Sequence, residues 1–352
     1  MPGLASRVRD LAREHLILLL PVLVFAGYFA VWYRIGRDPR LGRSIMPHYE
    51  PPDGIRPAEV GALVDGRVDQ RDVAALLVDL AVRGYLRIEE TREDGWLFDT
   101  TSYTFHRTKD PSAWERLLPF ERTMLRGLFG RQRASVKVEE LKNRFYTSLG
   151  LIRDQLYAAL DERGYVRFRP DRVRTGMTGA LVFVAVGSAI AANLAMGALG
   201  AHLLAAFGAA LVAIVVAFVF GRLMPALTRK GAEARFHVLG FEEYLSRAER
   251  DRLKLATPET FERFLPYAMA LGVEEQWARA FEGIYTRPPE WYAGASPPGR
   301  FTASSFTRSL GSMTSSAAST FASSPRSSSG SSGSGGGGRS GGGSGGGGGG
   351  AF

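Results

Sequence analysis

The longest apolar segment of the chain runs from Thr175 to Gly221, where 47 successive residues include no Asp, Glu, Lys or Arg. As one helix it would be about 70 Å long at about 1.5 Å per residue, roughly twice the ~30 Å thickness of the hydrocarbon core of a bilayer. The segment therefore predicts a hairpin of two transmembrane helices, over 176–197 and 201–223.

A second apolar segment, 16–33, is long enough for one more span and follows a short N-terminal segment, 1–15. A cleaved signal peptide is the alternative interpretation. Phe25 and Tyr28 interrupt the small-residue pattern that a cleavage site requires, so we expect an uncleaved anchor. Together the two segments predict an integral membrane protein with about three transmembrane helices.

Cationic side chains are concentrated beside these spans, and they account for much of the formal net charge of +9. The turn between the two hairpin helices contains no Lys or Arg, which is the pattern of an external loop. We therefore expect 34–175 and 224–295 to be cytoplasmic, and the bilayer rather than nucleic acid to be the anionic partner. The expected collar at the lipid headgroups comprises Arg34, Arg37, Arg40, Arg43, Arg163, Arg167, Arg169, Arg172, Arg174, Arg222, Arg229 and Lys230.

A stripe of small residues follows the last span, at Ala205, Ala209, Ala213 and Ala217. Spacing of four places them on one helix face, where they let two backbones approach closely. Packing within the chain is the simpler interpretation, and a homo-oligomer contact is the alternative.

The cytoplasmic segment 34–175 contains an internal repeat. Residues 76–88 and 156–168 align at a constant offset of 80, with Arg-Gly-Tyr in register. Each reads as an amphipathic helix, a glycine that stops it and a short alternating strand. Further helices are expected ahead of each repeat, over Pro57–Val64, and over Pro119–Phe129 with Val138–Phe145. With a second strand near Tyr103–His106, this order predicts an α+β, tandem winged-helix-like domain.

Winged helices often bind DNA through the helix that precedes the ribbon. Here the helices before Gly84 and Gly164 carry Asp79, Asp161 and Glu162 among their charges, whereas phosphate contacts require Lys and Arg. Nucleic acid is therefore disfavoured as a partner, and a protein partner is expected instead. The positions that we single out as candidate partner contacts are Tyr49, Glu50, Asp53, Arg71, Asp79 and Trp277.

Beyond the spans, residues 224–295 predict a helical C-terminal arm, because Thr257-Pro258 is typical of a helix start and Gly272 of a helix end. From 296 to 352 the chain is rich in Ser and then Gly, without an acidic residue. Such a composition predicts a disordered tail.

No catalytic, cofactor-binding or metal-binding pattern is present in the sequence. There is no cysteine, which excludes disulfides and thiolate chemistry, and no pair of the five histidines has metal-ligand spacing. We therefore expect no cofactor and no enzyme activity.

Several short motifs of the sequence are similar to those of a known family. The sequence resembles bacterial predicted membrane proteins of the domain-of-unknown-function 2207 family over about 30–352. The residues that carry the resemblance are Tyr-Glu-Pro-Pro-Asp-Gly at 49–54, Asp-Gly-Arg-Val-Asp at 65–69, Leu-Ala-Val-Arg-Gly-Tyr-Leu at 80–86, Gly-Phe-Glu-Glu-Tyr-Leu at 240–245, Leu-Pro-Tyr-Ala-Met-Ala-Leu-Gly-Val at 265–273, Trp277 and the glycine-rich tail.

The resemblance implies a bacterial cytoplasmic (inner) membrane protein with several spans, and it implies no chemistry. Members carry an extracytoplasmic β-rich domain ahead of the first retained span, where this chain has about 15 residues. This implies a short form, or a truncated start. The function that we expect is a membrane-anchored scaffold or adaptor. A membrane-tethered transcriptional regulator and an uncharacterised enzyme are the alternatives.

Overall fold

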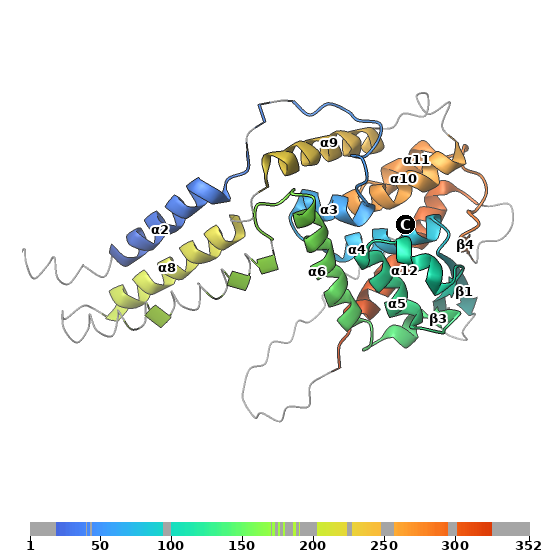
Figure 1. Cartoon of the computed structure of the whole chain (residues 1–352), viewed down its shortest axis with the longest axis horizontal. Coiled ribbons are helices and arrows are strands. Elements are labelled where there is room, and N and C mark those ends of the chain that lie inside the picture. Colours follow the sequence, from blue (N-terminus) through green and yellow to red (C-terminus); the bar gives the residue numbers. More distant parts are fainter. Residues whose placement is uncertain are drawn as a thin grey trace, which may run out of the picture.

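The computed structural model is an α+β fold in which one helix pair extends from a larger body (Figure 1). Helices α2 (Leu19–Val31) and α8 (Leu203–Leu223) form the pair, which we call the apolar helix pair, and the described residues 44–169 and 227–325 form the body. The structure describes residues 19–39, 41–42, 44–93, 100–169, 203–223, 227–247, 257–294 and 301–325, with a few positions between 171 and 190.

The first repeat consists of α3 (Pro57–Asp65), α4 (Gln70–Val82) and a ribbon of two antiparallel strands, β1 (Leu86–Glu93) and β2 (Thr100–Arg107). Pro57 fits the first position of α3 because its missing N–H would have no partner there. Asp69 caps α4 by accepting hydrogen bonds from the N–H groups of Arg71 and Asp72. These elements confirm the predicted order of helix, helix and ribbon in the first repeat.

The second repeat follows η3 (Pro111–Arg116) and contains α5 (Pro119–Phe129), β3 (Ser135–Lys137), η4 (Val138–Leu141) and α6 (Tyr146–Glu162). The prediction of a helix over 138–145 is wrong. Val136, Val138 and Leu141 enter the core from a strand and a single 3₁₀ turn, and Val136 pairs with Phe105 of β2. These buried side chains come from a strand and a 3₁₀ turn, and not from the α-helix that the spacing of apolar residues in the sequence suggests.

The sheet draws its strands from distant parts of the chain. Its order is β3-β2-β1-β4, where β4 (Tyr292–Ala293) lies parallel to β1 at Ile88 and Glu89. Strand β3 of the second repeat therefore extends the first ribbon on one side. Strand β4 extends it on the other side, and among the body helices only α12 follows β4 in the sequence.

Both repeats end their second helix with the same backbone geometry, as the offset of 80 predicts. Gly84 and Gly164 have φ angles of 71° and 69°, and the N–H groups of Tyr85 and Tyr165 donate to the carbonyls of Leu80 and Leu160 at 2.9 and 3.0 Å. A left-handed residue followed by such a bond ends a helix and starts a strand at once, which only glycine does without strain.

The equivalence continues across the ribbon. Leu86 pairs with Arg107 in the first repeat, and Val166, which aligns with Leu86, pairs with Leu227. A threonine follows Arg107 in the first repeat, and another follows Leu227 in the second. The hydroxyl of Thr108 donates to the carbonyl of Gly84 at 2.7 Å, and the hydroxyl of Thr228 donates to the carbonyl of Gly164 at 2.6 Å. The segment 167–226, which includes α8, is therefore an insertion into the ribbon of the second repeat.

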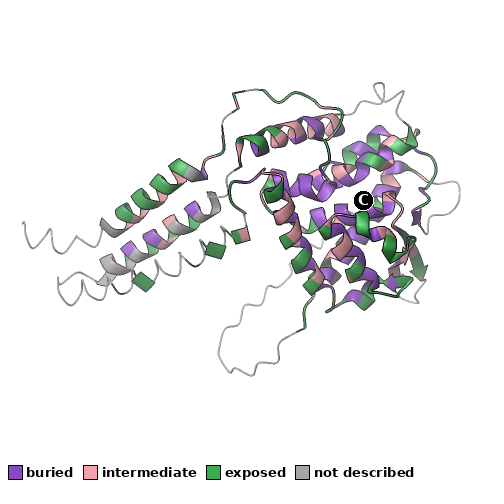
Figure 2. Cartoon of the chain, in the orientation of Figure 1, coloured by how far each residue is buried: buried purple, intermediate pink, exposed green. Residues whose placement is uncertain are grey.

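The remaining helices pack on these repeats. They are α9 (Arg229–Ser246), α10 (Pro258–Leu271), α11 (Glu274–Ala280) and α12 (Ala303–Ala322). They confirm a helical region after the apolar segment. The disordered tail expected from 296 is wrong for α12, because residues at helical spacing along it are buried in the body (Figure 2).

The prediction of about three transmembrane helices is also wrong for the part of the chain that the structure describes, where no helix is long and apolar enough to cross a membrane. Helix α2 has 13 residues, about 20 Å, before it passes into the π-helical turn η2 (Trp32–Gly36). The span expected over 176–197 lies mostly outside the described residues.

Candidate functional site

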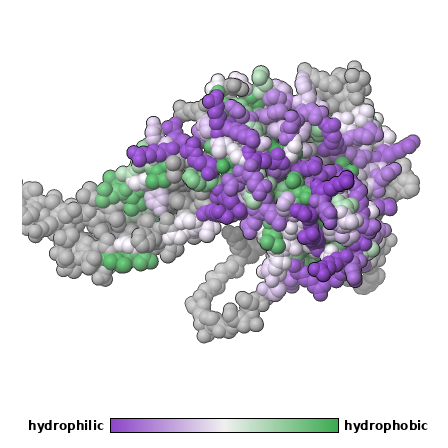
Figure 3. All heavy atoms as spheres, viewed as in Figure 1, coloured by the Kyte–Doolittle hydropathy of each residue, from purple (hydrophilic) through white to green (hydrophobic). Residues whose placement is uncertain are grey.

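The apolar helix pair exposes large apolar side chains instead of burying them. Figure 3 shows them as hydrophobic patches on the pair, while most of the body surface in this view is hydrophilic. A contiguous apolar surface on a folded protein marks a site of contact with lipid or with another protein. The exposed residues are Val22, Leu23, Phe25, Phe29, Val31, Tyr33, Leu211, Val212, Val215, Phe218 and Val219.

Aromatic and small residues hold the two helices together. Phe220 of α8 is buried, and its ring centroid lies 5.6 Å from that of Phe25 and 6.2 Å from those of Tyr28 and Trp32. Ala209 and Ala213 of the small-residue stripe are buried as well. The exposed apolar residues are therefore the outer surface of an already packed pair.

The expected collar divides into exposed cations and cations with partners inside the protein. Arg34, Arg172 and Arg229 are exposed, although Arg229 also pairs with Glu233 at 3.3 Å. The guanidinium of Arg37 lies over the ring of Tyr33, 4.8 Å from its centroid.

The other collar positions are less available to a headgroup or are not described. Arg169 pairs with Asp171 at 2.8 Å, Arg167 is exposed and has an interaction within the protein, and Lys230 donates to the carbonyl of Arg163 at 2.8 Å. The expected positions whose side chains lie outside the described residues are Arg40, Arg43, Arg174 and Arg222.

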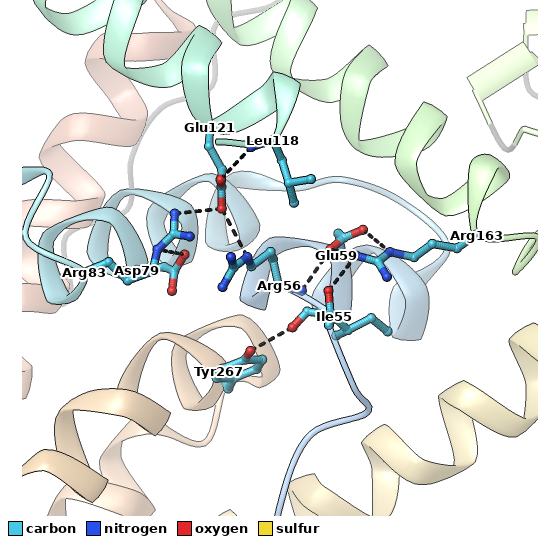
Figure 4. A network of polar contacts seen from close by, with 10 residues as sticks. Ile55, Arg56, Glu59, Asp79, Arg83, Leu118, Glu121, Arg163 and Tyr267 are labelled. Atoms are coloured by element: carbon cyan, nitrogen blue, oxygen red, sulfur yellow. Dashed lines mark hydrogen bonds and ion pairs between the residues drawn. The ribbon is translucent and has the colours of Figure 1, made fainter. Parts of the chain in front are cut away.

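Arg163 has a structural role that its place in the collar did not suggest. Its guanidinium donates to both carboxylate oxygens of Glu59, at 2.7 and 3.1 Å, and Glu59 is fully buried at the start of α3 (Figure 4). Glu59 also accepts a hydrogen bond from the backbone N–H of Arg56 at 2.9 Å. The arginine of the second repeat thus neutralises a carboxylate in the first.

The reciprocal contact is present too. Arg83, which aligns with Arg163, donates at 2.8 Å to Glu121, and Glu121 is fully buried at the start of α5, in the second repeat. Arg56 and Asp79 join this half of the network, at 3.3 Å from Glu121 and 3.1 Å from Arg83. Each Arg-Gly-Tyr therefore anchors the first helix of the other repeat, which locks the repeats into one body.

The candidate partner contacts fall into two groups. Tyr49, Glu50, Asp53 and Arg71 are exposed, and Glu50 forms an ion pair with Arg263.

Asp79 and Trp277 are buried and are not surface positions. Trp277 has 0% of its surface exposed and donates from its indole N–H to the carbonyl of Phe261 at 3.2 Å. Burial raises the pKa of Asp79 to about 6, against the opposing effect of Arg83. Both side chains therefore belong to the interior of the body.

Helix α4 is the helix that would enter a DNA groove in a winged-helix layout. It is covered by α3, α10 and α12, and it buries nine of its 13 residues, from Asp72 to Ala81. A helix that is buried on most of its surface has no face left for a major groove. This finding adds a structural argument against DNA contact through α4.

Three of the described histidines have polar or aromatic neighbours. The rings of His48 and His237 stack at 3.9 Å, and His106 lies 2.6 Å from Glu89 on the exposed face of the ribbon. Burial and the neighbouring His237 lower the pKa of His48. Within the described ranges no group of three His, Asp or Glu residues could hold a metal ion.

A hollow of about 590 Å³ lies where α12 crosses the start of α4. Arg67 and Arg71 line it from the body, and Thr307 and Thr314 from α12. Two buried atoms at its wall, the hydroxyl oxygen of Thr307 and one carboxylate oxygen of Glu274, have no hydrogen-bond partner. The contact between α12 and the body is thus incomplete at this point.

The family model of the predicted membrane protein (DUF2207) C-terminal domain matches residues 44–281, about two thirds of the chain. The chain belongs to this family. No curated protein and no solved structure matches it. Membership confirms the resemblance and supports a location at a membrane, while the DUF2207 description assigns no activity.

The match includes both repeats, the insertion and α9 to α11. Helix α12 lies beyond it, as does α2 on the other side. The DUF2207 domain of this chain is therefore covered by a helix that its family model does not contain. Sequence reasoning missed α12 because its Ser content outweighed a visible signal, the spacing of Phe306, Leu310, Met313 and Phe321.

Proposed function

We propose that this protein is a membrane-associated adaptor, whose apolar helix pair contacts lipid and whose body presents surfaces to a protein partner. The observation that carries the proposal is the insertion of α8 between Val166 and Leu227, because the β-bridge between these two residues joins an apolar surface to the folded repeats. Membership of a family of predicted membrane proteins supports the lipid contact.

The positions of exposed cations support a location of the body on the cytoplasmic side of the membrane. Among the exposed cations, Arg34 follows α2, Arg172 lies within the insertion and Arg229 follows it at the start of α9. Anionic lipids of a cytoplasmic leaflet attract such cations by about 1 kcal/mol each near the surface. The proposal therefore places the body on the cytoplasmic side of the bacterial inner membrane.

The adaptor role is supported by the interlocked repeats. Their order of helix, helix and ribbon favours the winged-helix interpretation, and in this body the groove-reading helix is used for packing. Exposed positions such as Arg71 of α4 and Leu151 of α6 remain for a partner.

Vesicle flotation tests the lipid contact with a matched pair of substitutions. Leu211 on α8 and Leu151 on α6 are similarly exposed, at 63% and 55%. Leu211→Asp should lower the recovery of the full chain with phosphatidylethanolamine–phosphatidylglycerol vesicles at least tenfold, because a carboxylate costs about 2.5–3.5 kcal/mol in hydrocarbon. Leu151→Asp should leave flotation unchanged. Equal flotation of both variants would refute the lipid contact.

Photocrosslinking in cells tests the adaptor role. A crosslinkable residue at Arg71 or Leu151 should capture the same protein reproducibly, and one at the fully buried Trp277 should capture none. Capture of nucleic acid alone, or of nothing, from the two exposed positions would contradict the adaptor proposal.

A further inference from the structure

The sequence of α12 has a low intrinsic helix propensity, and packing against the body orders it. Ten of its 20 residues are Ser or Thr, and Gly311 lies near its middle. Such residues disfavour an isolated helix in water, so its helical structure depends on the surface that it covers. Segments of this kind fold as they dock.

That surface is a groove on the DUF2207 domain. Its floor consists of α4, η4, α6 and α11, all within the family match. The apolar residues of α12 enter it at helical spacing: Phe306, Leu310, Met313, Ala317 and Phe321 are at most 3% exposed. This is the pattern by which an amphipathic helix occupies an apolar groove.

The anchors of α12 are concentrated at its ends. Near its start Ser304 donates to Glu282 at 2.8 Å through its hydroxyl. Near its end the ring of Phe321 stacks on that of Phe145 at 4.0 Å, and just beyond the helix the hydroxyl of Ser323 accepts from the N–H of Asn143 at 2.8 Å.

Between these anchors Leu310 and Met313 are fully buried, but the hydroxyl-bearing flank of α12 leaves an opening. The hollow of about 590 Å³ and the unpartnered hydroxyl of Thr307, which is 4% exposed, both lie there. The apolar face of α12 therefore fills the groove, whereas its flank at Thr307, Gly311 and Thr314 is not closely packed against the body.

We propose that this groove is an exchangeable docking site for an amphipathic helix, and that α12 is its resident occupant within the chain. A competing partner helix would carry apolar residues at the spacing of α12, with small or hydroxyl side chains between them. Because α12 is tethered, it competes at an effective concentration in the millimolar range, and a partner must exceed that. The inference extends the adaptor proposal by naming the surface and the chemistry of its partner.

The absence of cysteine in the chain allows a thiol-exchange test on the full-length protein. Ala317→Cys places a thiol under α12, and Ala75→Cys places one inside α4, where the native residues are 2% and 0% exposed. If α12 exchanges, Cys at 317 should react with a maleimide at least a hundredfold faster than Cys at 75. Equal protection of the two thiols would overturn the proposal.

A synthetic peptide of residues 301–324 provides the second measurement. Excess peptide should accelerate the reaction at 317 severalfold by keeping α12 out, and the same peptide with Leu310→Asp and Met313→Asp should not. If the cysteine variants do not fold, fluorescently labelled peptide replaces them: it should bind a full chain carrying Leu310→Asp and Met313→Asp at least a hundredfold more tightly than the unsubstituted chain. Failure of the peptide to bind or to accelerate would overturn the proposal, and neither result depends on lipid flotation.

Discussion

Removing the guanidinium of Arg163 should destabilise the body far more than its place among membrane-flanking arginines suggests. In Arg163→Ala the carboxylate of Glu59, which is fully buried, keeps its bond to the N–H of Arg56 but loses its neutralising charge. Breaking a buried ion pair by removing one partner costs about 3–5 kcal/mol. Because the Arg163 side chain is 26% exposed and water can reach the site, we expect the lower end, about 3 kcal/mol.

Urea denaturation followed by circular dichroism measures this effect. With a denaturant slope of about 1–3 kcal/mol per molar, the midpoint should fall by about 1–3 M. Arg229→Ala is the matched control, since Arg229 and Glu233 form an exposed pair and their loss should cost less than about 0.5 kcal/mol.

A double variant separates the charge from the packing. Adding Glu59→Gln to Arg163→Ala removes the buried charge and keeps an acceptor for the N–H of Arg56, so part of the lost stability should return. If Arg163→Ala unfolds at the same urea concentration as Arg229→Ala, the crossed ion pairs do not hold the repeats together.

Three further substitutions test the body. Burial raises the pKa of Asp72 from 3.8 to about 8. Folding therefore takes up a proton between these values, and the free energy of unfolding falls as pH rises from about 4 to about 8. Asp72→Asn should remove the part of this fall that Asp72 contributes, so its urea midpoint should drop less between pH 5 and pH 8.5 than that of the unsubstituted protein, to which Asp79 also contributes. Equal drops in the two proteins would contradict the prediction. Gly231→Ala should cost about 3 kcal/mol in thermal or urea unfolding, because its Cβ would lie 1.9 Å from the carbonyl oxygen of Tyr165. Gly150→Ala, in the open middle of α6 with nothing within 4 Å, should instead stabilise by about 0.5–1 kcal/mol, and equal effects of the two glycine substitutions would refute the close backbone contact.

Local patterns were sufficient to predict the repeats. The offset of 80 between the two Arg-Gly-Tyr sequences, Pro57 and Pro119 at helix starts, and alternation after Gly84 are short-range signals, and the helices and the first ribbon follow them. Membership of the family was recognisable from the same residues. The apolar segment correctly indicated a helix where α8 lies. Hydropathy also predicted transmembrane spans, but no helix among the described residues is long and apolar enough to be one.

Composition misled where packing decides. The Ser-rich segment that forms α12 has too few apolar residues to fold alone, and its order depends on a groove built from residues 70–162 and 274–280. Trp277 and Asp79 read as surface candidates because nothing near them in sequence indicates that α9 and α10 cover Trp277, or that α4, which carries Asp79, packs between α3 and α10.

The sequence by itself determined the boundaries of helices such as α3, α5 and α10, the internal repeat, the apolar segments and the family, because each depends on residues a few positions apart or on a pattern that repeats. Only the tertiary structure decided that Arg163 crosses to Glu59 and Arg83 to Glu121, that the apolar segment is inserted into a ribbon, and that α12 covers the groove. The physical reason is that a buried charge, a strand pair and a docked helix each acquire their partner from residues between about 40 and 180 positions away, and no local pattern encodes that distance.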